Sequence, residues 1–171
     1  MTSTPIYPPF LDAPAFSGRG LKEIPLIVKN EQHTMDFETI REQIRSKTSL
    51  YLLCNPHNPV GRCFTKEELQ ELADICLENN TIICSDEIHC DLVLDKNAKH
   101  TPIATLSPEI EQQTITLMAP SKTYNLPGLG FAFAVIPNYK LRKKFLRIMK
   151  GIVPYPTQIG MHAAEAAYKG G

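Results

Sequence analysis

Short apolar segments alternate along this chain with segments whose apolar residues recur at helical spacing, and this alternation limits the possible folds more than any other feature. Near-continuous apolar runs are typical of strands that are buried on both faces. Such runs occur at residues 24–28, 50–54, 81–84, 114–118 and 131–136. The pattern predicts an α/β fold with a mostly parallel sheet and helices on both faces.

Helices are expected between and after these strands. Residues 36–44 carry apolar side chains at helical spacing. Thr65 and Glu68 have the spacing of a capping box, which predicts a helix that begins there and ends at Asn79. Two further helices are expected near the end of the sequence, an amphipathic one at 140–150 and an Ala-rich one after Pro156.

The length and charge of the chain restrict the kinds of partner. Its 171 residues suit one domain, and its formal net charge is zero, so we do not expect a nucleic-acid partner. The first residues show no basic segment followed by an apolar one, and no window approaches the roughly 18 apolar residues of a membrane span. We therefore expect a cytoplasmic protein with no membrane partner.

Five cysteines are present, an odd number with no CxxC pair. This usage favours reduced, partly buried side chains over a disulfide framework. Cys84, His89 and Cys90 lie close in sequence, but their spacing matches no common zinc-ligand pattern. No metal is expected.

Polar motifs follow three of the predicted strands. They are residues 55–61 (Asn-Pro-His-Asn-Pro-Val-Gly), 85–89 (Ser-Asp-Glu-Ile-His) and 121–125 (Ser-Lys-Thr-Tyr-Asn). In α/β sheets, ligands bind beyond the carboxyl ends of the strands. The three motifs are therefore predicted to form one shared site.

The residue types in these motifs suit one kind of chemistry. A lysine such as Lys122 can form an imine with an aldehyde when its amine is partly desolvated or lies near other charges. Asp86 could keep a pyridine nitrogen protonated, which makes the ring an electron sink. Asn58, between His57 and Pro59 in a rigid turn, could donate a hydrogen bond to a phenolic oxygen of the same ring.

Each of these residues also has a purely structural interpretation. Lys122 could be a solvated surface charge, and Asp86 could cap a turn or a helix. Asn58 could serve only the turn, because Asn-Pro commonly opens turns. His89 could be an ordinary surface or core histidine, and Ser121 could be a helix cap. The ordered combination of the motifs favours the functional interpretation.

Together the motifs resemble those of fold-type I pyridoxal-phosphate enzymes, the class I and II aminotransferase superfamily. The longer strings at 54–62 and 119–123 are most similar to the cystathionine β-lyase branch, and the resemblance extends over nearly the whole chain. It implies pyridoxal 5'-phosphate as cofactor, an amino acid as substrate and a homodimer as the assembly. It further implies β-elimination from L-cysteine-type amino acids, which gives pyruvate, ammonia and a thiol.

The resemblance also assigns roles to individual residues. Lys122 becomes the Schiff-base lysine, Asp86 the partner of the pyridine nitrogen and Asn58 the partner of the phenolic oxygen. His89 occupies a position where many relatives carry a tyrosine that touches the same oxygen. Ser121 becomes a candidate for the phosphate shell.

The sequence departs from the family pattern at Gly130, where many aminotransferases carry a phosphate-binding arginine. The resemblance implies that residues 1–171 are an incomplete large domain, without the N-terminal phosphate cradle and the C-terminal small domain. Such a fragment would be weakly active or inactive by itself. Two alternatives remain open, an aminotransferase that uses the same residues and a non-catalytic fragment or regulatory module.

Overall fold

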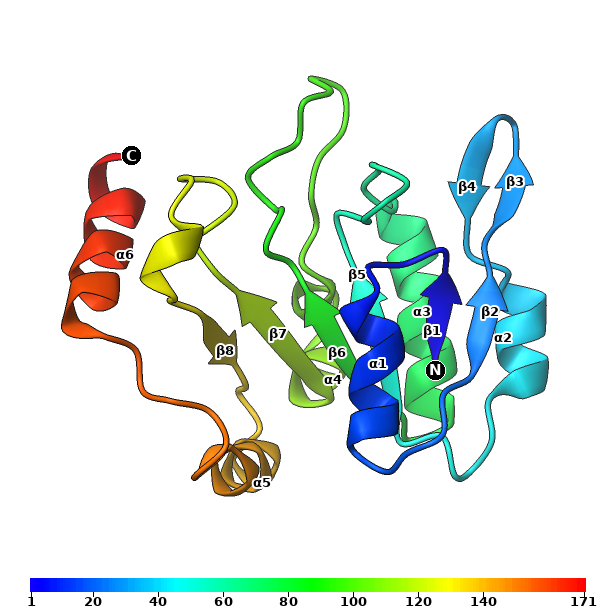
Figure 1. The fold of residues 1–171 in the computed structure, drawn as a ribbon. Coiled ribbons are helices and arrows are strands. Elements are labelled where there is room, and N and C mark those ends of the chain that lie inside the picture. Colours follow the sequence, from blue (N-terminus) through cyan, green and yellow to red (C-terminus); the bar gives the residue numbers. More distant parts are fainter.

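The computed structural model describes all residues, 1–171, and centres on a six-stranded sheet with the order β2-β1-β5-β6-β7-β8 (Figure 1). Neighbouring strands from β2 to β7 are parallel, and β8 is antiparallel to β7. A separate antiparallel hairpin is formed by β3 and β4. The strand bounds are β1 Thr2–Thr4, β2 Glu23–Pro25, β3 Ile27–Lys29, β4 Gln32–Thr34, β5 Leu50–Cys54, β6 Ile82–Asp86, β7 Thr114–Met118 and β8 Phe133–Val135.

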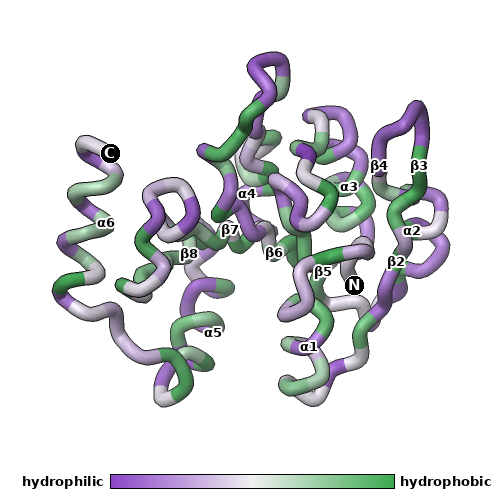
Figure 2. Tube along the Cα trace, turned by 45° about the horizontal axis from the view of Figure 1, so that its top comes forward, coloured by the Kyte–Doolittle hydropathy of each residue, from purple (hydrophilic) through white to green (hydrophobic).

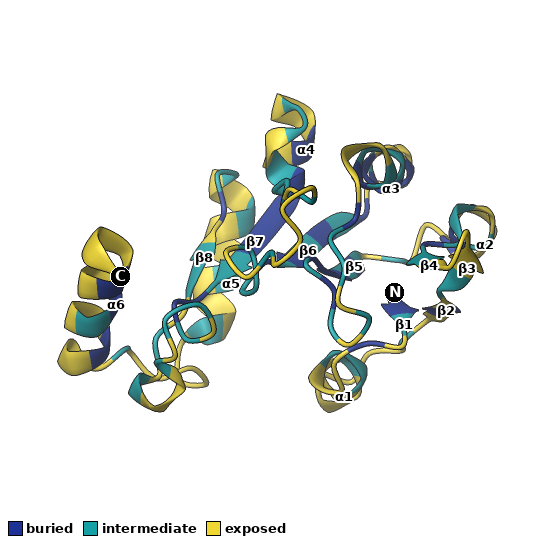
Figure 3. Ribbon diagram, turned by 90° about the horizontal axis from the view of Figure 1, so that it is seen from above, coloured by how far each residue is buried: buried dark blue, intermediate teal, exposed yellow.

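Helices lie on both sides of this sheet. Seen from above, α3 and α4 lie on one side and α1 on the other (Figure 3). The α-helices are α1 Pro9–Phe16, α2 Phe37–Gln43, α3 Lys66–Glu78, α4 Pro108–Gln112, α5 Tyr139–Met149 and α6 Gln158–Gly170, and two 3₁₀ turns are η1 Ile103–Thr105 and η2 Pro127–Leu129. The predicted fold class, a mostly parallel α/β sheet, is confirmed.

The core lies between the sheet and α3. Thr65 and Glu68 form the predicted capping box, which fixes the start of this helix. The helix buries an apolar face made by Leu69, Leu72, Ala73, Ile75 and Cys76. Those side chains share one cluster with Tyr51 and Leu53 of β5 and Ile83 of β6. The hydrophobic stretches of β5 and β6 stand out in Figure 2, whereas the tip of the loop after β6 is hydrophilic.

Several predicted boundaries were wrong. The expected strand at 24–28 is split, because β2 ends at Pro25 and the chain then leaves the sheet to form the hairpin. The Leu26 N–H still bonds to the Thr4 carbonyl at 2.7 Å, and pairing with β1 stops there. The expected strand at 131–136 contains only the three residues of β8. Conversely, β6 runs to Asp86 rather than ending at Cys84.

The strands β1 and β4, the helices α1 and α4 and the two 3₁₀ turns were not expected from the sequence. The strand β1 is short and polar, and α1 buries no residue and contains Pro14 within it. Neither shows an apolar pattern that would indicate regular structure. No helix in the structure combines the length and the apolar character needed to cross a membrane.

Candidate active site

The carboxyl ends of the parallel strands meet at one edge of the sheet, and the three polar motifs emerge there (Figure 1). Asp86 is the last residue of β6, so its direction is set by the strand and not by a loop. It pairs in register with Cys54 on one side and Leu117 on the other. Because paired residues share a face, Asp86 lies on the same face as apolar strand residues.

The Asp86 carboxylate lies in a setting that disfavours its charge. Burial raises the pKa of this carboxyl above its usual value, and the nearby charge of Glu87 adds to the effect. Its single hydrogen bond comes from the Ile88 N–H at 3.3 Å. That bond and the electrostatic effects of His89 and Lys122 lower the pKa of Asp86 in part. A cationic N–H group placed against this carboxylate would relieve the cost of its burial.

Ser121 and Lys122 lie in a turn that follows β7. The turn is closed by bonds from Tyr124 N–H to the Pro120 carbonyl and from Leu126 N–H to the Ser121 carbonyl, each 3.0 Å long. Lys122 is exposed, and Ser121 is half-buried. Of the two conditions expected for an imine-forming lysine, partial desolvation or a nearby charge, the structure shows the second, through Asp86.

The final helix supports this turn. At Gly160 of α6 a Cβ atom would lie 2.6 Å from the carbonyl oxygen of Leu129 in η2, so the helix approaches the turn as closely as its backbone allows. The Tyr168 ring stacks edge-on against Tyr124 with ring centroids 5.6 Å apart. Gly130, which stands where many aminotransferases carry a phosphate-binding arginine, has φ +58°, a conformation that favours glycine.

The segment at 55–64 is a compact turn after β5. The Gly61 N–H bonds to the His57 carbonyl at 2.8 Å, and the His57 N–H bonds to the Arg62 carbonyl at 2.8 Å. The buried Asn55 side chain accepts the Phe64 N–H at 3.0 Å. These bonds hold the half-buried Asn58 at the tip of the turn.

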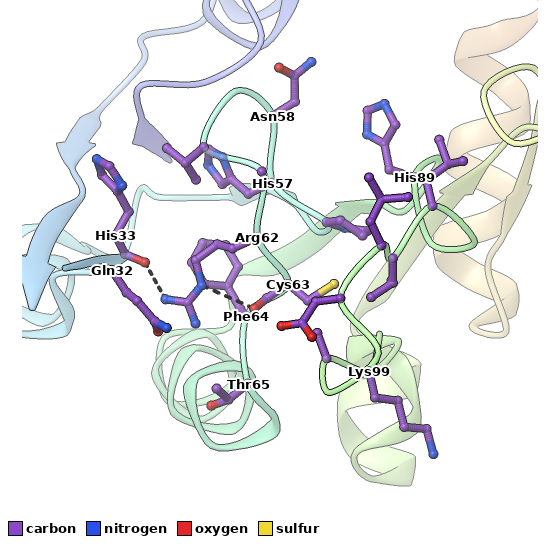
Figure 4. Close-up of a pocket in the computed structure, with 18 of the residues that line it drawn as sticks. Gln32, His33, His57, Asn58, Arg62, Cys63, Phe64, Thr65, His89 and Lys99 are labelled. Atoms are coloured by element: carbon purple, nitrogen blue, oxygen red, sulfur yellow. Dashed lines mark hydrogen bonds between the residues drawn. The ribbon is translucent and has the colours of Figure 1, made fainter. Parts of the chain in front are cut away.

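A cleft of about 1120 Å³ opens beside this turn. Its walls come from the hairpin, the turn at 55–64 and the loop after β6 (Figure 4). Asn58 and His89 line it, but Asp86, Ser121 and Lys122 do not. The structure therefore brings two of the five predicted site residues to one cleft, and it brings Lys122 within electrostatic range of Asp86 beside it.

Arg62 and Glu68 fix one wall of the cleft. The guanidinium makes two bonds to the carboxylate, of 3.2 and 2.6 Å, and a further bond to the His33 carbonyl of the hairpin (Figure 4). Thr34 donates its hydroxyl to the same carboxylate at 2.6 Å. The sequence pattern predicted Glu68 only as part of a helix cap, and it predicted no function for Arg62.

His57 is a second residue that the sequence did not single out. It is 4% exposed, and neither ring nitrogen has a hydrogen-bond partner. Burial lowers the pKa of His57 to about 4, and the charges of His33 and Arg62 act in the same direction. The ring packs edge-on against Phe64 at 5.5 Å and is neutral at physiological pH.

The cysteines are all free, as predicted, with Cys54 and Cys76 buried. The structure contains no group of three or more His, Cys, Asp or Glu side chains that could hold a metal ion.

The polar groups at this edge suit a pyridoxal-type ring. The half-buried carboxylate suits the ring nitrogen, and the amide at the turn tip suits the phenolic oxygen. The amine suits the aldehyde, and the hydroxyl suits the phosphate. Asp86 carries this fit furthest, because its raised pKa reflects a buried acid without a close cationic partner.

Comparison with known proteins agrees with this chemistry. The family described as aminotransferase class I and II matches residues 1–170. Cystathionine beta-lyase PatB of Bacillus subtilis is 38% identical over 98% of this chain and 44% of its own length. An aspartate aminotransferase of Geobacillus stearothermophilus is 34% identical over 78% of this chain and 33% of its own length.

Solved structures give the same result. Cystalysin from Treponema denticola, which contains pyridoxal 5'-phosphate, is 35% identical with a TM-score of 0.91, over 98% of this chain and 43% of that one. The chain thus spans less than half the length of the relatives it matches.

Proposed function

Because the chain belongs to the aminotransferase class I and II family, whose cofactor is pyridoxal phosphate, we propose that it forms an incomplete cofactor-binding large domain of a carbon–sulfur β-lyase. The substrates would be L-cysteine-type amino acids such as cystathionine. The observation that carries the proposal is Asp86, a half-buried carboxylate at the end of β6. Burial raises its pKa above the usual value, and the nearby His89 and Lys122 offset only part of this rise.

The proposal gives each site residue a defined role. Bound pyridoxal phosphate supplies an electron-accepting ring that stabilises negative charge at the α-carbon of an amino acid. Asp86 would keep a positive charge on the ring nitrogen, and Asn58 and His89 would donate hydrogen bonds to the phenolic oxygen of the ring. Lys122 would hold the aldehyde group, and its amine, once displaced by the amino group of the substrate, would accept the α-proton. Ser121 donates to the phosphate.

Among the curated relatives, the lyases align over more of this chain than the aminotransferases do, and this difference supports the lyase assignment. PatB and the cystathionine beta-lyase of Corynebacterium glutamicum align over 98% of this chain. The aspartate aminotransferase aligns over 78%. Aminotransfer stays the second candidate, because it needs the same lysine, acid and amide and differs only in the fate of the α-carbanion.

A paired assay separates these two reactions. The chain in its full-length context is given cystathionine, and separately an amino acid with a keto acid, and pyruvate, thiol and new amino acid are measured. Pyruvate and thiol in the first reaction support the lyase. New amino acid in the second, without pyruvate in the first, would replace the proposal with aminotransfer.

Cofactor binding is tested at Lys122. Borohydride reduction in the presence of pyridoxal phosphate should attach the cofactor to this lysine, and Lys122→Ala should abolish both the adduct and the near-visible absorbance. Lys96→Ala, a change at an exposed lysine in the loop after β6, is the control and should retain both. An adduct that survives Lys122→Ala would refute the assignment, and no adduct in the unmodified chain would favour a non-catalytic module.

A homodimer is also part of the proposal. Its support is a run of exposed apolar side chains along and after α5, which are Leu146, Ile148, Ile152, Tyr155 and Ile159. Exposed apolar patches commonly mark association surfaces. Sedimentation equilibrium should give twice the monomer mass, and a monomer at micromolar concentration would remove the dimer from the proposal.

A further inference from the structure

The loop between β6 and η1, residues 88–102, forms one wall of the cleft. It contributes His89 together with most of the residues from 92 to 101. Much of this loop is exposed, and Leu94 is 92% exposed. Main-chain hydrogen bonds of residues 91–101 join them only to other loop residues, such as Leu92 N–H to the His89 carbonyl and Ala98 N–H to the Asp95 carbonyl. The backbone therefore does not hold the wall in place.

Glu87, directly after Asp86, lies at the base of the loop. It is 1% exposed, and its N–H bonds to the Leu117 carbonyl of β7 at 3.0 Å. Its carboxylate accepts the Ser85 hydroxyl at 2.9 Å through Oε1. The sheet thus fixes both the backbone and one oxygen of this buried acid.

The other carboxylate oxygen of Glu87 is hydrogen-bonded to His100, which lies at the far end of the loop. The ring Nε2 lies 2.8 Å from Oε2, and the histidine side chain is 8% exposed. The ring Nδ1 is buried without a partner, so Nε2 makes the only polar contact of this ring. Apart from this pair, one side-chain bond joins residues 89–101 to a neighbouring segment, from the Thr123 hydroxyl to the Asp91 carboxylate at 3.5 Å.

We propose that Glu87 and His100 are positioning residues, which close the loop at 88–102 and so hold the cleft wall and His89 in place for the cofactor. The pair joins two residues thirteen positions apart, and a buried acid is costly to leave without its partner. The identity of the ligand, pyridoxal phosphate, rests on the proposed function. The closing of the loop rests only on the contact between Glu87 and His100. Ser85 and His100 both contact the carboxylate, with no bond between them, so the group is not arranged as a nucleophile with its base.

Proteolysis of the native full chain tests the claim about the loop. Chymotrypsin should cut after Leu92 and Leu94 about tenfold faster in His100→Ala, because opening of the loop becomes easier. Cutting after the exposed Phe16 of α1 should be unchanged, which separates local release from global unfolding. Lys96→Ala, in the same loop with the pair intact, should match the parent chain.

A conservative change keeps the test valid if the alanine variant is unstable. His100→Gln retains an amide N–H that can reach Glu87, and its cutting rate should stay within about twofold of the parent. Equal release in His100→Gln and His100→Ala, or no release in either, would overturn the proposed pairing.

Cofactor titration tests the consequence for the site. The pyridoxal phosphate concentration that half-saturates the near-visible absorbance should rise about tenfold in His100→Ala and recover in His100→Gln. Loop release without any change in this concentration would overturn the positioning role. If the parent chain itself bound no pyridoxal phosphate, the proposed function would fail, and the proteolysis result would still decide whether the pair closes the loop.

Discussion

The most informative perturbation of the fold is Glu68→Ala, because this carboxylate joins the hairpin, the turn at 55–64 and the start of α3. It accepts bonds from the Arg62 guanidinium, the Thr34 hydroxyl and the Thr65 N–H, the last at 2.7 Å. The side chains of Arg62 and Glu68 are 17% and 16% exposed. The pair is therefore more buried than the surface ion pairs whose net contribution is about 0–1 kcal/mol.

The expected loss can be estimated from these contacts. Losing the Glu68 half of the capping box costs about 1 kcal/mol. Breaking a fully buried ion pair costs about 3–5 kcal/mol, but Arg62 keeps some solvent and its bond to the His33 carbonyl, so about 2 kcal/mol is appropriate. Glu68→Ala should therefore lower the free energy of unfolding by about 3 kcal/mol. Glu68→Gln keeps one acceptor oxygen, which can serve the Thr65 N–H or the Thr34 hydroxyl but not both in their present positions, and it should cost about 2 kcal/mol.

Urea unfolding followed by far-UV circular dichroism measures these losses. The matched control is Glu71→Ala on the same helix, whose carboxylate lies 3.8 Å from an exposed Arg41. That change should cost less than about 0.5 kcal/mol. Equal losses in Glu68→Ala and Glu71→Ala would refute the reasoning, because the Arg62 pair would then be energetically a surface pair.

Two further predictions concern His57 and Gly160. The pKa of His57 is lowered to about 4 in the folded chain, so between about pH 6.5 and 4 the unfolded chain binds a proton that the folded chain does not. Stability should be fully present above that window and fall as the pH drops through it, and a His57→Phe variant with an unchanged pH slope in urea unfolding would contradict this origin. Gly160→Ala should cost about 1–3 kcal/mol, since the added Cβ would lie 2.6 Å from the Leu129 carbonyl. Gly170→Ala is the control, because a Cβ there meets nothing within 4 Å, and it should be nearly neutral in the same urea unfolding experiment. Equal effects of the two changes would argue against the close approach of α6.

The parts of the fold that could be predicted are those in which burial depends on apolar side chains. The strands β5, β6 and β7 are apolar runs, and the capping box marks the start of α3. The strand β1 could not be predicted, because it is buried through polar contacts: Thr2 donates its hydroxyl to the Leu52 carbonyl at 2.8 Å, and Ser3 shares a 2.6 Å bond with the Tyr51 hydroxyl. A three-residue polar strand has no pattern until its partner strand is known.

The same distinction applies to the site. The turn that carries Asn58 is organised by bonds among residues 55–64, and for that reason its motif could be recognised in the sequence. The segment after β7 that carries Lys122 packs instead against α6, about forty residues later, through Tyr168 against Tyr124 and Gly160 against Leu129. His100 likewise acts on Glu87 from the far end of a loop. The motifs therefore indicated which segments end at this edge of the sheet, and of the five predicted residues Asn58 and His89 line the cleft. The distant contacts required the three-dimensional structure, and changes at Gly160 or His100 should alter the site without touching any of the five predicted residues.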